Sequence, residues 1–397
     1  MNTENDKKAT SIILETNYTG HRSEYVSHLM KFINTQAGLY GKFVFILDEK
    51  MNALLGELSK SPNYSIRYFD FDKKHKNSVA RSFWEWNLIA ELILELKSIR
   101  EIMFMDIDPY LVLLISSRFK KLNLSVKGIL FQPYVHFKEI NGGISFYMKK
   151  VFKNYLFQKY SVFINSNIHK IFILNDKNSV AIMNKKIKKV FYNLPDPIEN
   201  DIIDIDAESS EKIKEKYAIK LGKKNLLLFG SIDDRKNLIN IIDSLRLLPA
   251  EAKKNIHLII AGKLSEDVKD KYIEHIEKHK TEVSIAYNNG FVNAREREPL
   301  FENCDLVLMP YINFFSASSV LGHTIIHNKN VVVSNMGIIG RFVNEHKVGI
   351  SVDPRNTNAI KEAIRTLLYN SKEFEYDNTH LVDEFSPLNF SKTILLN

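Results

Sequence analysis

Two adjacent cations, Arg235 and Lys236, are the residues whose types and spacing point most directly to a chemical role. They end the stretch GSIDDRK, which begins at Gly230 and joins a predicted strand to a predicted helix. A helix N-terminus favours anions, so two cations there are locally unfavourable unless an anionic ligand binds them. A solvated basic turn beside Asp233 and Asp234 explains the same charges equally well.

A serine-rich turn, SASS, comes between the predicted strand 306–309 and the next predicted helix. Ser318 and Ser319 are placed to cap that helix, and its free N–H groups form a ready site for a phosphate. Most serine-rich helix starts only cap a helix, so the turn by itself favours capping.

In the first half of the chain, four candidate residues follow predicted strand ends: Gly20, His21, Asp106 and His136. Parallel sheets bind ligands at the carboxyl ends of their strands, so we expect these residues near a binding site. A lone histidine is more often structural than catalytic. Asp106 and Asp108 are two positions apart, but two nearby carboxylates alone make a weak metal site, and we predict none.

Strand and helix patterns alternate along the chain, which predicts an α/β fold with mostly parallel sheets. Short apolar runs predict strands at 11–14, 43–47, 65–69, 101–105, 126–131, 226–229, 256–261, 282–287, 306–309 and 331–333. Longer periodic runs predict helices, among them 82–96, 110–119, 237–248, 266–279, 295–303 and 358–369. Two prolines and an acidic stretch after Leu194 mark a boundary. We therefore expect two α/β domains facing each other across a cleft.

The composition, 45% hydrophobic and 26% charged over 397 residues, is that of an ordinary globular protein of about two domains. The single cysteine, Cys304, excludes a disulfide framework and a cysteine metal cluster, which fits a reducing compartment. The polar first residues carry no signal-peptide core, and no apolar run is long enough to span a bilayer. We expect a cytoplasmic protein.

The charge is uneven, since residues 1–195 hold 29 Lys and Arg against 17 Asp and Glu, a net of +12. This indicates that the first domain faces an anionic ligand or surface, and without a nucleic-acid motif we expect no nucleic acid. In the segment 137–163, lysines alternate with aromatics: Lys149, Lys150, Lys153 and Lys159 with Phe146, Tyr147, Phe152, Tyr155, Phe157 and Tyr160. Such a helix lies on an anionic membrane, here the inner face, or buries its aromatic face in the domain. Both interpretations remain open, with slightly more weight on the second.

Several stretches of the second half, in this order and spacing, carry a family resemblance: LPDPIEN, LLLFGSIDDRKN, HLIIAGK, the GFV loop and the block 309–353. Residues 194–368 resemble the nucleotide-sugar glycosyltransferases of the GT-B fold, especially family four. The resemblance implies two Rossmann-like domains, an acceptor-side domain at 1–195 and a nucleotide-sugar-binding domain at 223–370. Residues 196–222 are then a linker, and the tail 371–397 packs back on the first domain.

In the resembling family, the adjacent Arg and Lys hold the donor diphosphate, which implies this role for Arg235 and Lys236 near Gly230. The loop after the GFV-like strand meets the nucleotide base, which points to Phe291 and Val292. These residues form the expected donor side.

The stretch TGHRSEY resembles the glycine-bearing first loop of such enzymes, with Gly20 under the donor and His21 near the acceptor. His136 falls where the family often has a histidine close to the reacting sugar. Asp106 is then placed to act on an acceptor hydroxyl.

This chain departs from the family where two glutamates usually stand eight positions apart, because Phe315 and His323 occupy those positions. The block SASSVLGH is similar to a divergent subgroup instead. Ser318 and Ser319 could bind the diphosphate through backbone and hydroxyl groups. His323 serves equally well as a ribose partner or as a structural histidine.

The resemblance implies a glycosyltransferase that moves a sugar from a nucleotide diphosphate donor to a glycan or lipid-linked hydroxyl acceptor in surface polysaccharide synthesis. It implies no cofactor, independence of metal and retention of the anomeric configuration. Two other functions remain open: a GT-B-like sugar-nucleotide epimerase, and a non-catalytic glycan-binding or partner subunit without the glutamates.

Overall fold

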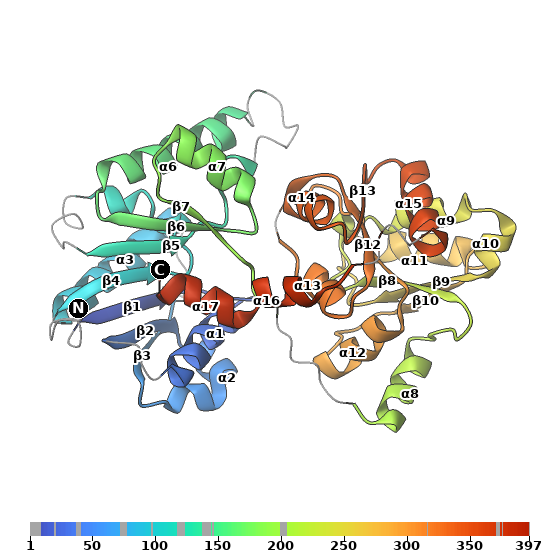
Figure 1. Cartoon of the computed structure of the whole chain (residues 1–397), viewed down its shortest axis with the longest axis horizontal. Coiled ribbons are helices and arrows are strands. Elements are labelled where there is room, and N and C mark those ends of the chain that lie inside the picture. The colour runs from blue at the N-terminus through green and yellow to red at the C-terminus, as the bar shows by residue number, and fades with distance from the viewer. Residues whose placement is uncertain are drawn as a thin grey trace. The chain divides into compact units, whose positions relative to one another are not determined.

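The computed structural model describes residues 9–19, 21–36, 41–71, 78–96, 98–116, 124–136, 144, 147–198, 205–315, 317–370, 374 and 376–396. The chain forms two compact units, Met1–Pro197 with Pro387–Asn397, and Ile198–Ser386. Each unit has one parallel sheet between layers of helices (Figure 1). None of the described helices combines the length and apolarity needed to cross a membrane.

The first unit is built on a seven-stranded sheet of order β3-β2-β1-β4-β5-β6-β7, paired in parallel throughout. Its strands are β1 (Thr10–Glu15), β2 (Lys42–Asp48), β3 (Tyr64–Phe69), β4 (Ile99–Phe104), β5 (Ser125–Ile129), β6 (Ile168–Leu174) and β7 (Phe191–Leu194). The strand order changes direction between β1 and β4. Sheets of this kind bind ligands at such a switch point, beyond the carboxyl ends of the strands.

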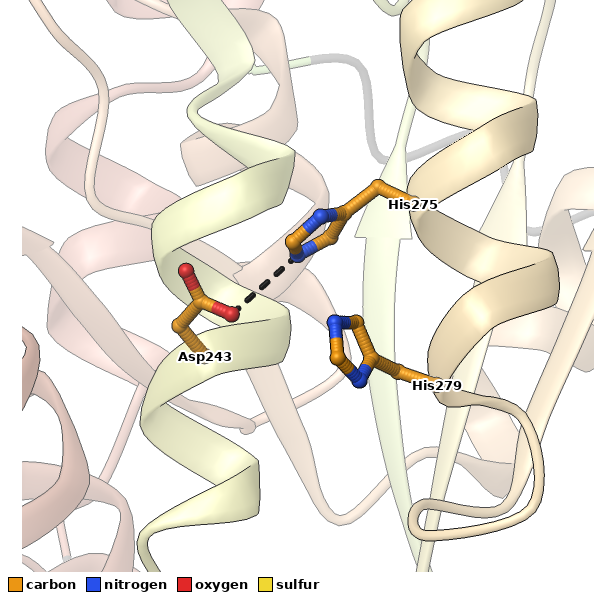
Figure 2. Close-up of side chains that lie close together, drawn as sticks. All are labelled: Asp243, His275 and His279. Atoms are coloured by element: carbon orange, nitrogen blue, oxygen red, sulfur yellow. Dashed lines mark hydrogen bonds and ion pairs between the residues drawn. The ribbon is translucent and has the colours of Figure 1, made fainter.

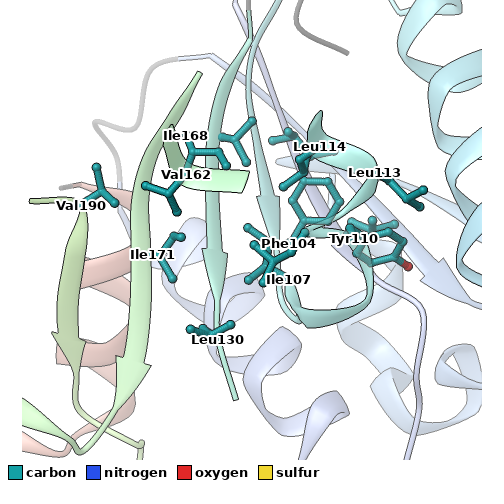
Figure 3. Close-up of a cluster of buried hydrophobic side chains, with 14 of the residues drawn as sticks. Phe104, Ile107, Tyr110, Leu113, Leu114, Leu130, Val162, Ile168, Ile171 and Val190 are labelled. Carbon is teal, nitrogen blue, oxygen red and sulfur yellow. The ribbon is translucent and has the colours of Figure 1, made fainter. Parts of the chain in front are cut away.

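Alternate residues of the first sheet point to its two faces and build two cores, so Ile12 and Leu14 join one and Ile13 the other. Figure 3 shows part of the first core, in which Phe104 and Tyr110 lie beside Leu113 and Leu114. The helices of this unit are α1 (Arg22–Thr35), α2 (Met51–Leu55), α3 (Ser78–Glu95), α6 (Lys153–Ile164), α7 (Lys177–Lys186) and α17 (Pro387–Leu395).

The helix predicted over residues 110–119 is wrong for its described part, 110–116. The structure has two short 3-10 helices instead, Asp108–Tyr110 and Leu113–Ile115. The side chain of Asp108 accepts hydrogen bonds from the amides of Phe131 and Gln132, which fixes the turn before a helix can extend. Tertiary contacts here outweigh the helical periodicity.

The second unit is built on a six-stranded parallel sheet of order β10-β9-β8-β11-β12-β13. Its strands are β8 (Lys224–Phe229), β9 (Ile256–Ala261), β10 (Ile285–Asn288), β11 (Leu306–Met309), β12 (Asn330–Ser334) and β13 (Gly349–Val352). Its helices are α8 (Ala207–Lys216), α9 (Leu238–Arg246), α10 (Ala250–Lys254), α11 (Lys269–His279), α12 (Ala294–Asn303), α13 (Ser319–Ile326), α14 (Gly337–His346), α15 (Thr357–Tyr369) and α16 (Thr379–Glu384). Residues of α9, α11 and α15 fill the core on one face, and residues of α12, α13, α14 and α16 fill the other. The switch point lies between β8 and β11.

The unit boundaries differ in detail from the ranges expected from the sequence. Within the segment 196–222, α8 folds as part of the second unit and packs against α12. The tail 371–397 is divided, because α16 lies in the second unit and α17 in the first. Helix α17 packs against α1, and the fully buried Phe390 places its ring 5.1 Å from that of Tyr25.

Replacing Phe390 by Ala should therefore weaken the first unit selectively. Loss of a buried phenylalanine costs about 3–5 kcal/mol of unfolding free energy. Hydrogen exchange followed by mass spectrometry should show faster exchange in α1 and β1–β3 and unchanged exchange in α9 and α15. Leu396→Ala, at a residue 58% exposed in the same tail, is the control and should leave both units unchanged.

Candidate functional site

The loop after β8 begins with Gly230, whose φ of 100° suits glycine. Its N–H donates to the carbonyl of Ala261 at 3.0 Å. A side chain at Gly262, the next residue of that neighbouring loop, would place its Cβ only 1.8 Å from the oxygen of Gly230. The two glycines therefore let the loops after β8 and β9 lie in direct contact.

Lys236 lies beneath this loop and is 3% exposed. Its Nζ donates to the carbonyl of Phe229 at 2.8 Å and to the hydroxyl of Tyr311 at 2.6 Å, and it sits 4.2 Å from the centre of the Tyr311 ring. Burial lowers the pKa of the amine to about 7, and the charge of Arg235 acts in the same direction. An amine with a pKa near 7 is only partly protonated at neutral pH, so an approaching anion can bring it to full protonation.

Ser318 is the N-cap residue of α13. Its side chain makes no hydrogen bond to the backbone of this helix start, so the capping expected from the sequence is wrong within the described residues, which exclude Ser316. Burial raises the pKa of the nearby Tyr311 phenol, and the Ser318 side chain opposes this rise. Tyr311 therefore bonds Lys236 and lies near the start of α13.

Asn237 ties three loops together. It adopts the left-handed conformation at φ 62°, and its side-chain amide donates to Pro310 at 2.9 Å and Pro354 at 2.6 Å. These carbonyls follow β11 and β13, so one side chain holds the loops after β8, β11 and β13. The sequence pattern alone does not indicate this role. The usable signal was an asparagine, which tolerates positive φ, directly before a helix.

Arg235 is the accessible cation of the site, with its side chain 37% exposed. Its Nε donates to both carboxylate oxygens of Asp233 at 3.2 Å, and its guanidinium lies 5.0 Å from the ring centre of Phe314. The ion pair is partly exposed and therefore weak, so an anionic ligand can compete for the guanidinium.

The remaining donor-side candidates lie on other loops and helices of the same unit. Phe291 follows β10 and is 85% exposed, whereas Val292 is half-buried against the core. His323 is half-buried in α13, with its ring 5.6 Å from that of Phe301 in α12. Ser319 is exposed at the first position of α13.

In the first unit, Arg22 connects the ends of β1 and β4, and our sequence analysis missed it. Its guanidinium donates to Asp106 at 2.7 Å and to Glu15 at 3.2 Å, and it lies 4.0 Å from the ring centre of Phe131. The neighbouring His21 is exposed, with Nδ1 2.6 Å from Glu24. Gly20 lies outside the described residues.

Burial shifts the pKa of two carboxyl groups at this edge of the sheet. Glu15 is 2% exposed, and burial raises its pKa to about 7 although Arg22 opposes the shift. Burial also raises the pKa of Asp108 well above its usual range, and the charge of Asp106 adds to the rise. Asp106 turns to Arg22, while Asp108 accepts the amide of Phe131 at 2.7 Å. The two carboxylates are therefore engaged by different protein donors.

His136 is 8% exposed and its Nε2 lies 2.7 Å from Asp176. The same carboxylate accepts the amide of Ser179 at 2.9 Å and so caps α7. This pair joins the loops after β5 and β6, at the same edge of the sheet as Arg22 and Asp106. Our sequence analysis found the histidine but not its partner, because the two are forty residues apart.

The family model described as "Glycosyl transferases group 1" matches residues 209–378, all within the second unit. The serotype-specific mannosyltransferase WbdA of Escherichia coli is 26% identical over 112 residues, which are 28% of this chain and 14% of WbdA. The chain therefore spans only a small part of this curated relative's length.

Solved structures match nearly the whole chain. WaaG, a glycosyltransferase involved in lipopolysaccharide biosynthesis, is 15% identical with a TM-score of 0.66, covering 97% of this chain and 99% of WaaG. Anabaena HepE in complex with UDP is 13% identical with a TM-score of 0.70, covering 97% and 98%. At these identities the likeness establishes the fold, and it confirms the predicted α/β fold of two Rossmann-like domains.

The buried amine of Lys236 should leave a pH signature in stability. In the unfolded chain the amine keeps its proton up to its ordinary pKa of 10.5, whereas in the native fold it loses it above about pH 7. The unfolded state binds more protons in that interval, so this group makes stability rise with pH, by up to about 1.4 kcal/mol per pH unit. Below pH 7 its contribution is flat.

Urea unfolding of wild type and Lys236→Met between pH 6 and 10 measures this effect. The stability of wild type relative to the variant should rise from pH 7 upward. Lys220→Met, at an exposed position, controls for general charge effects. A difference that does not change with pH would contradict the buried, neutralised amine.

Proposed function

We propose that the chain moves a sugar from a nucleotide diphosphate donor to a hydroxyl acceptor. The match of the group 1 glycosyltransferase model to residues 209–378 and the likeness of the fold to WaaG support this proposal. The observation that carries this proposal is the buried amine of Lys236 beneath Gly230, which donates to the hydroxyl of Tyr311 near the start of α13. An amine with a pKa of about 7 readily gains and loses its proton at neutral pH, which suits a site that binds and releases an anion.

The proposed donor contacts follow from charge and exposure. Arg235 and Lys236 bind the diphosphate, and the helix start at Ser318 and Ser319 adds backbone donors. As the bond to the sugar breaks, negative charge grows on the diphosphate, and these groups stabilise it without a metal ion. The exposed ring of Phe291 offers an apolar surface for the base. HepE was solved with UDP, which makes UDP the first nucleotide to test.

On the first unit, the proposed acceptor-side residues are His21, Asp106 and His136. Asp106 is held by Arg22, and His136 by Asp176, so both side chains have a fixed orientation. The acceptor is a glycan or lipid-linked sugar hydroxyl, a proposal supported by the lipopolysaccharide and serotype functions named for WaaG and WbdA. Retention of configuration is part of this proposal and rests on the family resemblance.

A turnover assay separates the three functions. A transferase releases nucleoside diphosphate from its sugar donor only when an acceptor is present, and the proposal requires this to continue in EDTA. An epimerase converts the sugar nucleotide without an acceptor, and a binding subunit releases nothing. Loss of transfer in EDTA that Mg²⁺ or Mn²⁺ restores would instead favour a metal at Asp106 and Asp108.

Replacing Arg235 or Lys236 by Ala should weaken UDP binding by about 1–3 kcal/mol each, the scale of hydrogen bonds to charged groups. Calorimetry should also show proton uptake on binding at pH 8, because the diphosphate raises the pKa of Lys236, and this uptake should vanish in Lys236→Ala. Lys254→Ala, at a side chain 76% exposed, should bind like wild type. Unchanged affinity in both single variants would remove the donor assignment.

Helix α6 supports a contact between the first unit and an anionic membrane. Large apolar side chains on it, and Phe152 directly before it, are exposed: Phe152 by 43%, Phe157 by 38%, Tyr160 by 52% and Phe163 by 57%. Lys153 and Lys159 lie over neighbouring aromatic rings, 5.3 Å from Phe157 and 5.9 Å from Phe163. The aromatic face is thus only partly buried, which favours the membrane interpretation. Phe146 and the side chains of Tyr147, Lys149 and Lys150 lie outside the described residues.

Changing Lys153 and Lys159 together to Gln should reduce sedimentation with anionic liposomes at low salt by about thirtyfold in affinity, since each lysine contributes about 1 kcal/mol. Phe157→Ser with Phe163→Ser should reduce it further, while UDP binding stays intact. Lys185→Gln with Lys186→Gln, on the exposed end of α7, is the matched control. Equal sedimentation of all variants would show that α6 is ordinary domain packing.

A further inference from the structure

Three potential metal ligands lie together on the helices α9 and α11 of the second unit (Figure 2). Asp243 comes from α9, and His275 and His279 come from successive turns of α11. The Nε2 of His275 is 3.2 Å from Oδ1 of Asp243, and one donor atom from each residue lies within 4.8 Å of the others. The described part of the chain contains no other such group of three.

The spacing fits a tetrahedral transition metal. Histidines four residues apart on a helix face the same side, one turn above the other. Ligands about 2.0 Å from a zinc ion are about 3.3 Å from one another, which matches the distance between His275 and Asp243. Only a small rotation of His279 is needed, and Figure 2 shows one of its ring nitrogens already turned toward the other two side chains.

Glu282 orients the second histidine. Its carboxylate lies 3.2 Å from Nδ1 of His279, which leaves Nε2 for a ligand. A histidine that binds a metal commonly donates its other nitrogen to a carboxylate in this way. His279 is 3% exposed, so water competes little for the position.

Arg246 opposes a cation at this position. Its guanidinium lies 3.3 Å from Oδ1 of Asp243 and 3.1 Å from Glu282. Its side chain is 35% exposed and can swing outward, so a metal ion can displace it from the carboxylate. Arg246 and a metal ion therefore compete for the carboxylate of Asp243, and an experiment can measure this competition.

We propose that Asp243, His275 and His279 bind one Zn²⁺ ion, with water as the fourth ligand. Two imidazoles and a carboxylate are a ligand set that suits zinc. The ion connects α9 to α11 and stabilises the second unit. Asp243 lies about 9 Å along the helix from Asn237, so the site is separate from the donor loop. Chelation should therefore lower stability without removing the ability to bind UDP.

The test uses the untagged full chain, dialysed against a chelator and titrated with Zn²⁺ in competition with a coloured indicator. Wild type should bind one ion per chain and unfold at a higher temperature with zinc present. His275→Asn and His279→Gln should each bind at least tenfold more weakly and lose the thermal shift. Glu282→Gln should weaken binding about tenfold, the usual effect of removing such an orienting group.

His380→Asn, at an exposed histidine of the same unit, is the matched control and should bind like wild type. Arg246→Gln should bind zinc at least threefold more tightly, because the competing cation is gone. The proposal would be overturned if wild type showed no saturable zinc binding. It would also be overturned if both histidine variants bound zinc with the affinity of wild type. If those variants do not fold, unchanged or weaker affinity in Arg246→Gln would overturn it.

Discussion

The strands of each sheet are parallel, so their carboxyl ends all lie at the same edge of that sheet. Loops far apart in the sequence therefore meet there, and side chains connect them. In the second unit Asn237 joins the loops after β8, β11 and β13, and Lys236 donates to Tyr311 in the loop after β11. In the first unit Arg22 joins the ends of β1 and β4, and Asp176 joins His136 to the start of α7. Each set of loops is held together before any ligand binds.

Both edges contain ionisable groups whose pKa is shifted by burial in favour of the neutral form. Lys236 and Glu15 each have a pKa of about 7, one lowered and one raised, because a charge without water is unfavourable. Such groups do not improve stability, since apolar residues of similar size would be buried at less cost. They lie where the strands end, the edge at which parallel sheets bind ligands, and this agrees with the anion site proposed for Lys236.

The sequence predicted most of the second unit, because its short apolar strands and periodic helices agree with the structure over β8, β9 and β11 and over α9, α11 and α15. It also identified the Arg235–Lys236 turn. It did not identify the residues that position this turn, Tyr311 and Asn237, since their contacts are made across 75 and 73 residues. The prediction of a helix over 110–119 was wrong because periodicity does not register the hydrogen bonds that Asp108 accepts from the neighbouring strand end.

By itself, then, the sequence determined the alternation of elements, the two-unit organisation and the positions of charged residues after strands, because these depend on local periodicity and chain order. Only the tertiary structure decided which charges are buried, since burial depends on neighbours from distant segments. It showed that Lys236 is covered, that the side chain of Ser318 makes no capping hydrogen bond, and that α17 returns to the first unit. It also brought Asp243 to His275, thirty-two residues away, because α9 and α11 pack side by side on one face of the second sheet.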